Sequence, residues 1–219
     1  MPTDNNADGH HLLVLQHGLW GNIGHVRFIA EQFKQRLGGR ILVYRARANE
    51  SGFTYDGVDI CGHRVVQEIY SVIKVIETGG SIEEMKGQKL NKHKGKKNIQ
   101  PDDFEARSTT KKVIQFSYLG YSLGGLIGRF AMGMLDLDGF FDQVEQGGRG
   151  EQLQLVDDYI GGKPILLVIS ESSCVFIHAL ARFKRRVLYC NIRNDLAVPF
   201  WTASFSDADP FRKLDSMEM

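Results

Sequence analysis

The sequence predicts an α/β fold in which a mostly parallel sheet carries helices on both faces. An apolar run, an amphipathic run and a second apolar run follow one another with short connections over residues 11–45. Later, a run rich in branched and aromatic residues, 113–119, is followed after a short glycine-rich stretch by an apolar helix-like run, 126–135. A chain of 219 residues with 42% hydrophobic content can bury one sizeable core. We therefore expect a single domain over residues 1–219.

The segment 11–45 reads as a strand, a helix and a second strand. Residues 11–16 (HLLVLQ) form a continuous apolar run, which is typical of a strand buried on both faces. Residues 25–37 place their apolar side chains on one helical face, and Gly38-Gly39 is a typical helix end. Residues 40–45 (RILVYR) form the second strand. Because the connections are short, we expect the two strands to be parallel in a βαβ unit.

The middle of the chain contains a second helix and a basic segment. Residues 46–63 are predicted to form a loop, and 64–77 a helix with an apolar inner face. Residues 86–97 carry six lysines and no acidic residue. This segment is either a basic patch that approaches anionic lipid or nucleic acid, or part of a mobile surface insertion at about 78–110. The insertion is favoured, because such charge runs tend to be disordered and no aromatic residues are interleaved for nucleic-acid binding.

Three further elements are predicted after the basic segment and the helix-like run. Residues 164–170 (PILLVIS) read as a strand, although Pro164 also suits the start of a helix. Residues 173–182 are expected to form a short helix. Residues 186–192 (RVLYCNI) are predicted to form a buried strand, and Asp195 follows its carboxyl end.

The stretch 120–124 (GYSLG) is a Gly-x-Ser-x-Gly pentapeptide between a predicted strand and a predicted helix. This context is typical of a nucleophile elbow, a tight turn that exposes a serine hydroxyl at the carboxyl edge of a sheet. The turn has room only for small neighbours, which Gly120 and Gly124 provide. The helix amino terminus stabilises developing negative charge. Ser122 is therefore the candidate nucleophile of a hydrolase, and a chance turn is the alternative.

A serine hydrolase also needs an acid, a base and donors for the oxyanion. Asp195 is the candidate acid, because a carboxylate just past a strand end can face the turn from the same sheet edge. A loop-capping aspartate is the alternative. The candidate oxyanion donors are the backbone N–H groups of Leu123 and Leu19, and Trp20 is the candidate substrate-binding residue. Other aromatic residues that either line an acyl pocket or pack in the core are Phe53, Tyr55, Phe200 and Trp201.

The base is the missing member, because no histidine follows Asp195 in the sequence. His178 lies in an apolar helix-like segment, which indicates a packed core residue. His17 is expected to be a turn residue, because it lies on the oxyanion side. Losing the base costs a protease triad on the order of a millionfold in turnover. Two functions therefore stay open: an esterase, or a catalytically inactive protein of the same fold that binds lipid or a protein partner.

Composition narrows the partners and the location. A net charge of +1 gives no indication of nucleic-acid or anionic-membrane binding. No run of 18 apolar residues is present, and the polar start MPTDNNADGHH does not resemble a signal peptide. The three cysteines form no C-x-x-C pair, which favours buried free thiols. We expect a cytoplasmic protein with no transmembrane segment, no cofactor and no metal.

Four pieces of the chain resemble the serine esterase family of α/β-hydrolases, which includes fungal Rog-like and lipid-droplet lipases. The pieces are HLLVLQHGLWGN (11–22), TYDGVDICGHRVVQEI (54–69), LGYSLGGLIGRFAMGML (119–135) and ALARFKRRVLYCNIRNDLAVPFWTA (179–203). The resemblance implies an α/β-hydrolase sheet with Ser122 as nucleophile and Asp195 as acid. It also implies acyl-ester or phospholipid substrates, and a peripheral position at a lipid surface such as that of lipid droplets.

The chain departs from the family pattern at two places. Family members carry a strand after the elbow helix that ends in a Thr-Pro-His-x-Gly-like segment. Here GFFDQVE (139–145) runs directly into QGGRGEQ (146–152). The chain also ends before the strand and the histidine that the fold would supply after Asp195. We therefore expect an incomplete sheet in a shortened product, with a deletion near residue 145.

Overall fold

A computed structural model describes residues 10–79, 112–142, 145–147, 165–191 and 200–204. The chain divides into two compact units, Met1–Arg186 and Val187–Met219. Most of the predicted insertion at 78–110 and the candidate acid Asp195 lie outside the described residues. The single-domain organisation stays a prediction.

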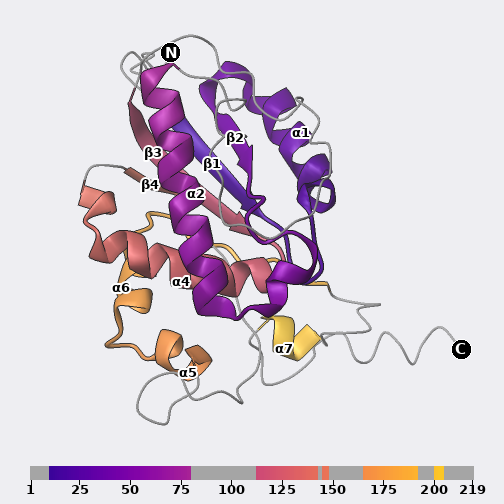
Figure 1. The fold of residues 1–219 in the computed structure, drawn as a ribbon, viewed down its shortest axis with the longest axis vertical. Helices are drawn as coiled ribbons and strands as arrows, with labels where there is room; N and C mark the ends of the chain where they lie inside the picture. The colour runs from indigo at the N-terminus through magenta and orange to yellow at the C-terminus, as the bar shows by residue number, and fades with distance from the viewer. Residues whose placement is uncertain (1–9, 80–111, 143–144, 148–164, 192–199, 205–219) are drawn as a thin grey trace, which may run out of the picture. The chain divides into compact units, whose positions relative to one another are not determined.

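The first unit is built on a parallel sheet with the strand order β2-β1-β3-β4 (Figure 1). The strands are β1 (His10–Gln16), β2 (Leu42–Arg45), β3 (Val113–Gly120) and β4 (Glu145–Gly147). β1 is central and pairs with both β2 and β3. Its apolar run is fully buried, with Leu12, Val14 and Leu15 at 0% exposure. The βαβ unit predicted for residues 11–45 is therefore confirmed.

Helices cover both faces of this sheet (Figure 1). Alternate side chains of a strand point to opposite faces, so β1 shows which helices lie on which side. Leu13 and Leu15 pack with Ala30 of α1 (Arg27–Leu37). Leu12 and Val14 belong to the core formed with α2 (Val58–Thr78) and α4 (Leu123–Leu137). The predicted α/β class is confirmed, and the arrangement is consistent with an α/β-hydrolase-like fold.

Shorter elements complete the described chain. In the first unit they are η1 (Ile23–Val26), η2 (Gly38–Arg40), η3 (Ser51–Tyr55), η4 (Phe140–Asp142), α5 (Ile165–Ser170) and α6 (Val175–Ala181). The second unit contains α7 (Phe200–Ser204). All three cysteines are free, as predicted, although Cys61 alone among them is buried. Among the described helices, none has the length and apolarity needed to cross a membrane.

Helix α2 begins at Val58, inside the segment 46–63 that was predicted to be a loop. Gly62 lowers the helix propensity of this region, but it is needed for packing. A Cβ at Gly62 would lie 2.4 Å from the Phe130 ring of α4. Close packing of two helices therefore outweighs the low propensity of glycine, and the loop prediction is wrong for residues 58–63.

The strand predicted for residues 164–170 is wrong, and the alternative helix start is correct. Residues Ile165–Ser170 form α5. Ile165, Leu166 and Ile169 are buried in a cluster with residues of α4 and α6. Their spacing matches one face of a helix, so a helical partner surface decides the conformation of this short apolar run.

The strand predicted for residues 186–192 is also wrong over 186–191, the part that the structure describes. Tyr189 is 86% exposed, and Val187 and Leu188 are partly exposed. Branched and aromatic residues favour a strand because they fit a pleated, half-buried surface. No strand among the described residues pairs with this segment, so that surface is not formed.

Strand β4 occupies the place where a strand was expected to be missing. Glu145–Gly147 pairs in parallel with β3, and Gly147 lies opposite Ser117. Backbone N–H and C=O groups pair whatever the side chains are, so even a Gln-Gly sequence can extend the sheet beside β3. The sheet therefore continues beside β3 after the elbow helix, and the deletion near residue 145 stays a prediction.

Candidate active site

Ser122 lies in a tight turn between the end of β3 and the start of α4. Its backbone has φ 54° and ψ −128°, a conformation that residues with a side chain rarely adopt. Hydrogen bonds fix the turn: Tyr121 N–H donates to Gln16 C=O at 2.9 Å, and Gly124 N–H donates to Tyr121 C=O at 2.9 Å. The strand, tight turn and helix predicted around Ser122 are therefore present, and the serine is exposed at the helix amino terminus.

The glycines beside Ser122 are sterically required. A Cβ at Gly120 would lie 2.5 Å from Gly124 C=O and from Gly125 N. A Cβ at Gly124 would lie 2.6 Å from the carbonyl oxygens of Gln16 and His17. These neighbours are backbone atoms and cannot rotate away. The first turn of α4 therefore fits directly against the carboxyl end of β1.

The turn after β1, residues 18–21, lies against the serine. A Cβ at Gly18 would lie 2.7 Å from Ser122 Cβ and 3.2 Å from Ser122 Oγ. Within the described residues, no acceptor is bonded to the N–H of Leu19 or of Leu123. Two N–H donors with no acceptor in the described chain thus come from segments that flank one hydroxyl, as the predicted oxyanion site requires.

The orientation of the Leu19 N–H follows from the bonds of the preceding carbonyl. Gly18 C=O accepts from Gly21 N–H at 3.0 Å and is contacted by His17 Nδ1 at 3.1 Å. In a trans peptide the N–H points away from the C=O. Because Gly18 C=O points into the turn, the Leu19 N–H points out of it.

His17 is a buried turn residue, as predicted. Its ring is fully buried, and Nε2 has no hydrogen-bond partner among the described residues. A carbonyl can only accept, so Nδ1 carries the proton that it shares with Gly18 C=O. Burial lowers the pKa of His17, against the opposing effects of that hydrogen bond and of Glu50. The neutral ring thus serves to hold the turn.

Acidification is expected to destabilise the protein through His17. Because its pKa is lowered on folding, the unfolded chain binds the extra proton, and stability falls as pH drops below about 6.5. The slope per group has a limit of about 1.4 kcal/mol per pH unit. His17→Asn keeps an amide N–H near the position of Nδ1 but does not titrate, so its slope is expected to be shallower.

Urea unfolding of both proteins between pH 7.5 and 5.5 measures this difference. His11, whose pKa burial also lowers, and Glu68, whose pKa burial raises, contribute equally to the two curves and cancel. If the free energy of unfolding depended on pH equally in wild type and in His17→Asn, His17 would not be a source of the acid destabilisation.

Exposed apolar side chains surround this turn. Trp20 is 62% exposed and has a positive φ of 52°, and its ring meets Tyr55 edge-on at 5.9 Å. Leu19, Tyr55 and Tyr121 are also exposed. Trp20 and Tyr55 thus lie at the surface. Phe200 belongs to the second unit, and the Trp201 side chain lies outside the described residues.

No base is bonded to Ser122 within the part of the chain that the structure describes. His178 is exposed on α6, so its prediction as a packed core residue is wrong. Phe176 and Ala179, three residues apart, form the buried face of that helix, and His178 lies off it. Asp195 lies outside the described residues, and the strand that was expected to lead to it is absent over 186–191. Its assignment rests on the resemblance.

Sequence reasoning missed two side chains that shape this region, Thr54 and Glu68. The Thr54 hydroxyl accepts a hydrogen bond from Trp20 N–H at 3.1 Å. Glu68 Oε1 accepts from the Tyr44 hydroxyl at 2.6 Å and from Arg47 N–H at 2.8 Å. A polar residue within the apolar pattern of α2 was the available signal for Glu68. Nothing in the local pattern distinguishes Thr54 from an ordinary loop threonine.

Comparison with known proteins identifies relatives of this chain. Residues 6–90 and 140–208 match the family described as "Putative serine esterase (DUF676)". "Putative lipase YDL109C" of Saccharomyces cerevisiae is 28% identical, over 89% of this chain and 30% of that protein. "Putative lipase ROG1" of the same yeast is 27% identical, over 89% of this chain and 28% of that protein. This chain therefore spans less than a third of the length of either relative.

No solved structure matches the chain. The turn around Ser122 falls between the two segments matched by the family. Those segments include the turn after β1, helix α2 and α6, and together they cover well over half of the chain. The chain belongs to the family described as "Putative serine esterase (DUF676)".

Proposed function

We propose that this chain carries the nucleophile of a serine esterase that acts on acyl esters of lipids. The observation that supports it most is the backbone of Ser122, held at φ 54° at the start of α4 with Gly18 against it. Strain in a serine that projects from a helix amino terminus has no packing purpose here, because the side chain is exposed. It suits a hydroxyl that must meet a substrate.

In the proposed reaction, Ser122 Oγ bonds to the acyl carbonyl carbon and loses its proton to a base. The carbonyl oxygen becomes an oxyanion that accepts from the N–H groups of Leu19 and Leu123. The C–O bond to the alcohol then breaks, and the alcohol leaves with a proton. Water attacks the acyl-enzyme, and the acid departs as Ser122 regains its hydrogen. Asp195 is the proposed acid that orients the base.

The proposed substrates are lipid esters, because two relatives are named lipases. The exposed side chains of Trp20, Leu19 and Tyr121 support contact with an acyl chain or with a lipid surface. We extend the proposal to peripheral contact with such a surface, in the cytoplasm or at lipid droplets, without nucleic acid as a partner.

One observation favours a second function, a catalytically inactive protein that binds lipid or a protein partner. Ser122 Oγ has no hydrogen-bond partner within the described residues. A serine without a base remains a weak nucleophile. The two functions share the same surface and differ in whether Ser122 reacts.

A fluorophosphonate probe tests the esterase directly. We expect covalent labelling of the wild type and of Ser71→Ala, and complete loss of label in Ser122→Ala. Ser71 is the matched control because its exposed hydroxyl only bonds to Gln67 C=O within α2. Turnover of a p-nitrophenyl acyl ester should follow the same pattern.

Absence of label and turnover in folded wild type would exclude the esterase. Sedimentation with phosphatidylcholine vesicles containing triacylglycerol then tests the lipid-binding form of the second function. Binding that weakens in Trp20→Ala would support a lipid-binding protein, and no binding would exclude it.

A further inference from the structure

We infer that Thr54 is a positioning residue, which holds the turn 18–21 in the conformation that presents the Leu19 N–H beside Ser122. The inference rests on the proposed esterase for its catalytic consequence. It has a structural consequence that can be measured without any activity.

The Thr54 hydroxyl both donates and accepts a hydrogen bond. Oγ1 donates its hydrogen to Ser51 C=O at 2.9 Å and accepts from Trp20 N–H at 3.1 Å. Thr54 is only 4% exposed, so water does not replace either bond readily. Because the hydrogen is fixed on Ser51, a lone pair of Oγ1 stays directed at Trp20.

This bond acts on a strained peptide. Leu19 and Trp20 are the central residues of the turn closed by Gly21 N–H on Gly18 C=O at 3.0 Å. Trp20 has a φ of 52°, a backbone conformation that is unfavourable for a bulky residue. The bond from Trp20 N–H to Thr54 compensates for that cost by holding the Leu19–Trp20 peptide in place. Without the bond, the peptide can relax, and relaxation would turn the adjacent Leu19 N–H away.

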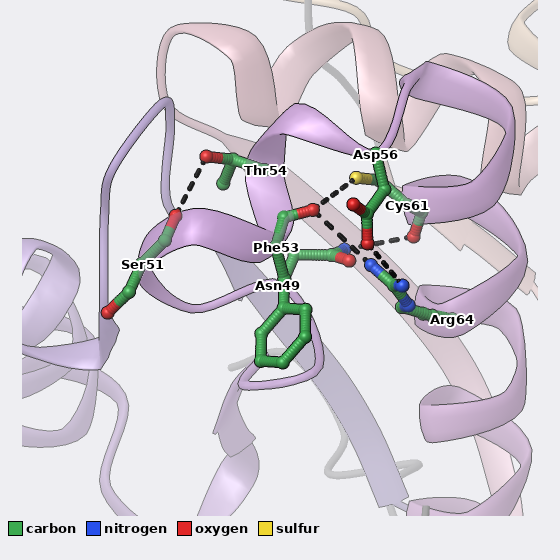
Figure 2. Close-up of polar contacts among 7 residues, drawn as sticks. All are labelled: Asn49, Ser51, Phe53, Thr54, Asp56, Cys61 and Arg64. Carbon is green, nitrogen blue, oxygen red and sulfur yellow. Dashed lines mark hydrogen bonds and ion pairs between the residues drawn. The ribbon is translucent and has the colours of Figure 1, made fainter. Parts of the chain in front are cut away.

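The segment that carries Thr54 is itself anchored to α2 (Figure 2). Phe53 C=O accepts from Cys61 Sγ at 3.3 Å and from Arg64 Nη1 at 3.3 Å. The Arg64 guanidinium also lies 5.3 Å from the centre of the Phe53 ring and forms an ion pair with Asp56. The position of Thr54 is therefore fixed by α2, and its hydrogen bond to Trp20 N–H fixes the turn 18–21 in place.

Two more hydrogen bonds connect the end of the turn to the segment that carries Thr54. Ser51 N–H donates to Gly21 C=O at 2.8 Å, and Glu50 Oε1 accepts from Ile23 N–H at 3.0 Å. Both act after the strained position, on the exit of the turn. Thr54 differs because its bond reaches the peptide next to the proposed oxyanion donor.

The experiment compares Thr54→Val with Thr54→Ser. Valine keeps the shape of threonine and removes the hydroxyl, whereas serine keeps the hydroxyl. Thr78→Val is the matched control, because Thr78 is exposed and its hydroxyl bonds only within α2. Two quantities are measured on the whole chain: the exchange rate of the Trp20 amide hydrogen, and the kinetics of Ser122 with the fluorophosphonate and a p-nitrophenyl ester.

We expect Thr54→Val to speed exchange of the Trp20 amide by roughly tenfold, the equivalent of one lost hydrogen bond. The kcat for the ester and the labelling rate constant should fall by roughly tenfold with KM within about twofold, because the oxyanion contact strengthens in the transition state. Thr54→Ser should restore both to within about threefold, and Thr78→Val should change neither.

Unchanged Trp20 exchange in Thr54→Val would overturn the inference. Faster exchange with unchanged Ser122 kinetics in an active wild type would overturn it as well. If the wild type neither labels nor turns over ester, the proposed esterase fails, and the exchange rates alone decide whether Thr54 holds the turn.

Discussion

Gly124→Ala is expected to destabilise the protein by about 3 kcal/mol or more and to displace the turn that carries Ser122. The added Cβ would lie 2.6 Å from two carbonyl oxygens, those of Gln16 and His17 at the end of β1. Gln16 is the last residue of the central strand, which is paired on each side, and His17 follows it directly in the backbone. Relief therefore requires α4 to move away from the sheet, and that movement opens the core beneath it.

Gly52→Ala is the matched control for this prediction. Gly52 has nothing within 4 Å of the position of its missing Cβ. Its substitution should change the free energy of unfolding by no more than about 0.5 kcal/mol. Urea unfolding followed by far-UV circular dichroism measures both variants. Equal midpoints for Gly124→Ala and Gly52→Ala would show that α4 does not meet β1 so closely.

Glu68→Leu should have the second large effect, again about 3 kcal/mol or more. Glu68 is 4% exposed, and its carboxylate accepts from the Tyr44 hydroxyl, Arg47 N–H and Ala48 N–H at 2.6, 2.8 and 3.1 Å. Leucine is of similar size but removes the Glu68 acceptor of all three donors, two of which are in the backbone that follows β2. Each unsatisfied buried donor costs about 1–3 kcal/mol.

Two further variants isolate the hydrogen bonds from the helix itself. Glu77→Leu places the same substitution on an exposed position of α2 and should be nearly neutral. Glu68→Gln keeps one acceptor oxygen and should lie between wild type and Glu68→Leu. The midpoints of thermal unfolding order the series. A Glu68→Leu protein as stable as Glu77→Leu would mean that the three donors find water instead.

The elements that the sequence predicts correctly are those whose signal is local. β1 contains an unbroken apolar run and β3 is rich in branched and aromatic residues. α1 has a clear helical period, and the turn at Ser122 carries its own glycines. Hydrophobic periodicity and turn residues can be read from the sequence without knowing which element packs against them. The short connections then predict that the first two strands are parallel neighbours.

The elements that are predicted wrongly depend on a distant partner. Residues 165–170 and 186–191 both favour a strand by composition, yet the first packs as a helix on α4 and the second has no strand beside it in the described chain. The start of α2 depends on Phe130, which lies far along the sequence and requires Gly62. Similarly, the proposed positioning role of Thr54 depends on a strained peptide at Trp20, more than thirty residues earlier in the sequence.

The pairing of β1 with β3 has a consequence for the length of the chain between them. Gln16 and Gly120 are neighbours in the sheet, and Gly18 and Ser122, two residues further along each strand's path, meet at the turn. Strand register, rather than the number of intervening residues, sets this distance. Loop-closure cost grows slowly with length, because each doubling of a flexible loop adds only about 0.6 kcal/mol. A longer or shorter segment between α2 and β3 would thus still bring Gly18 to Ser122.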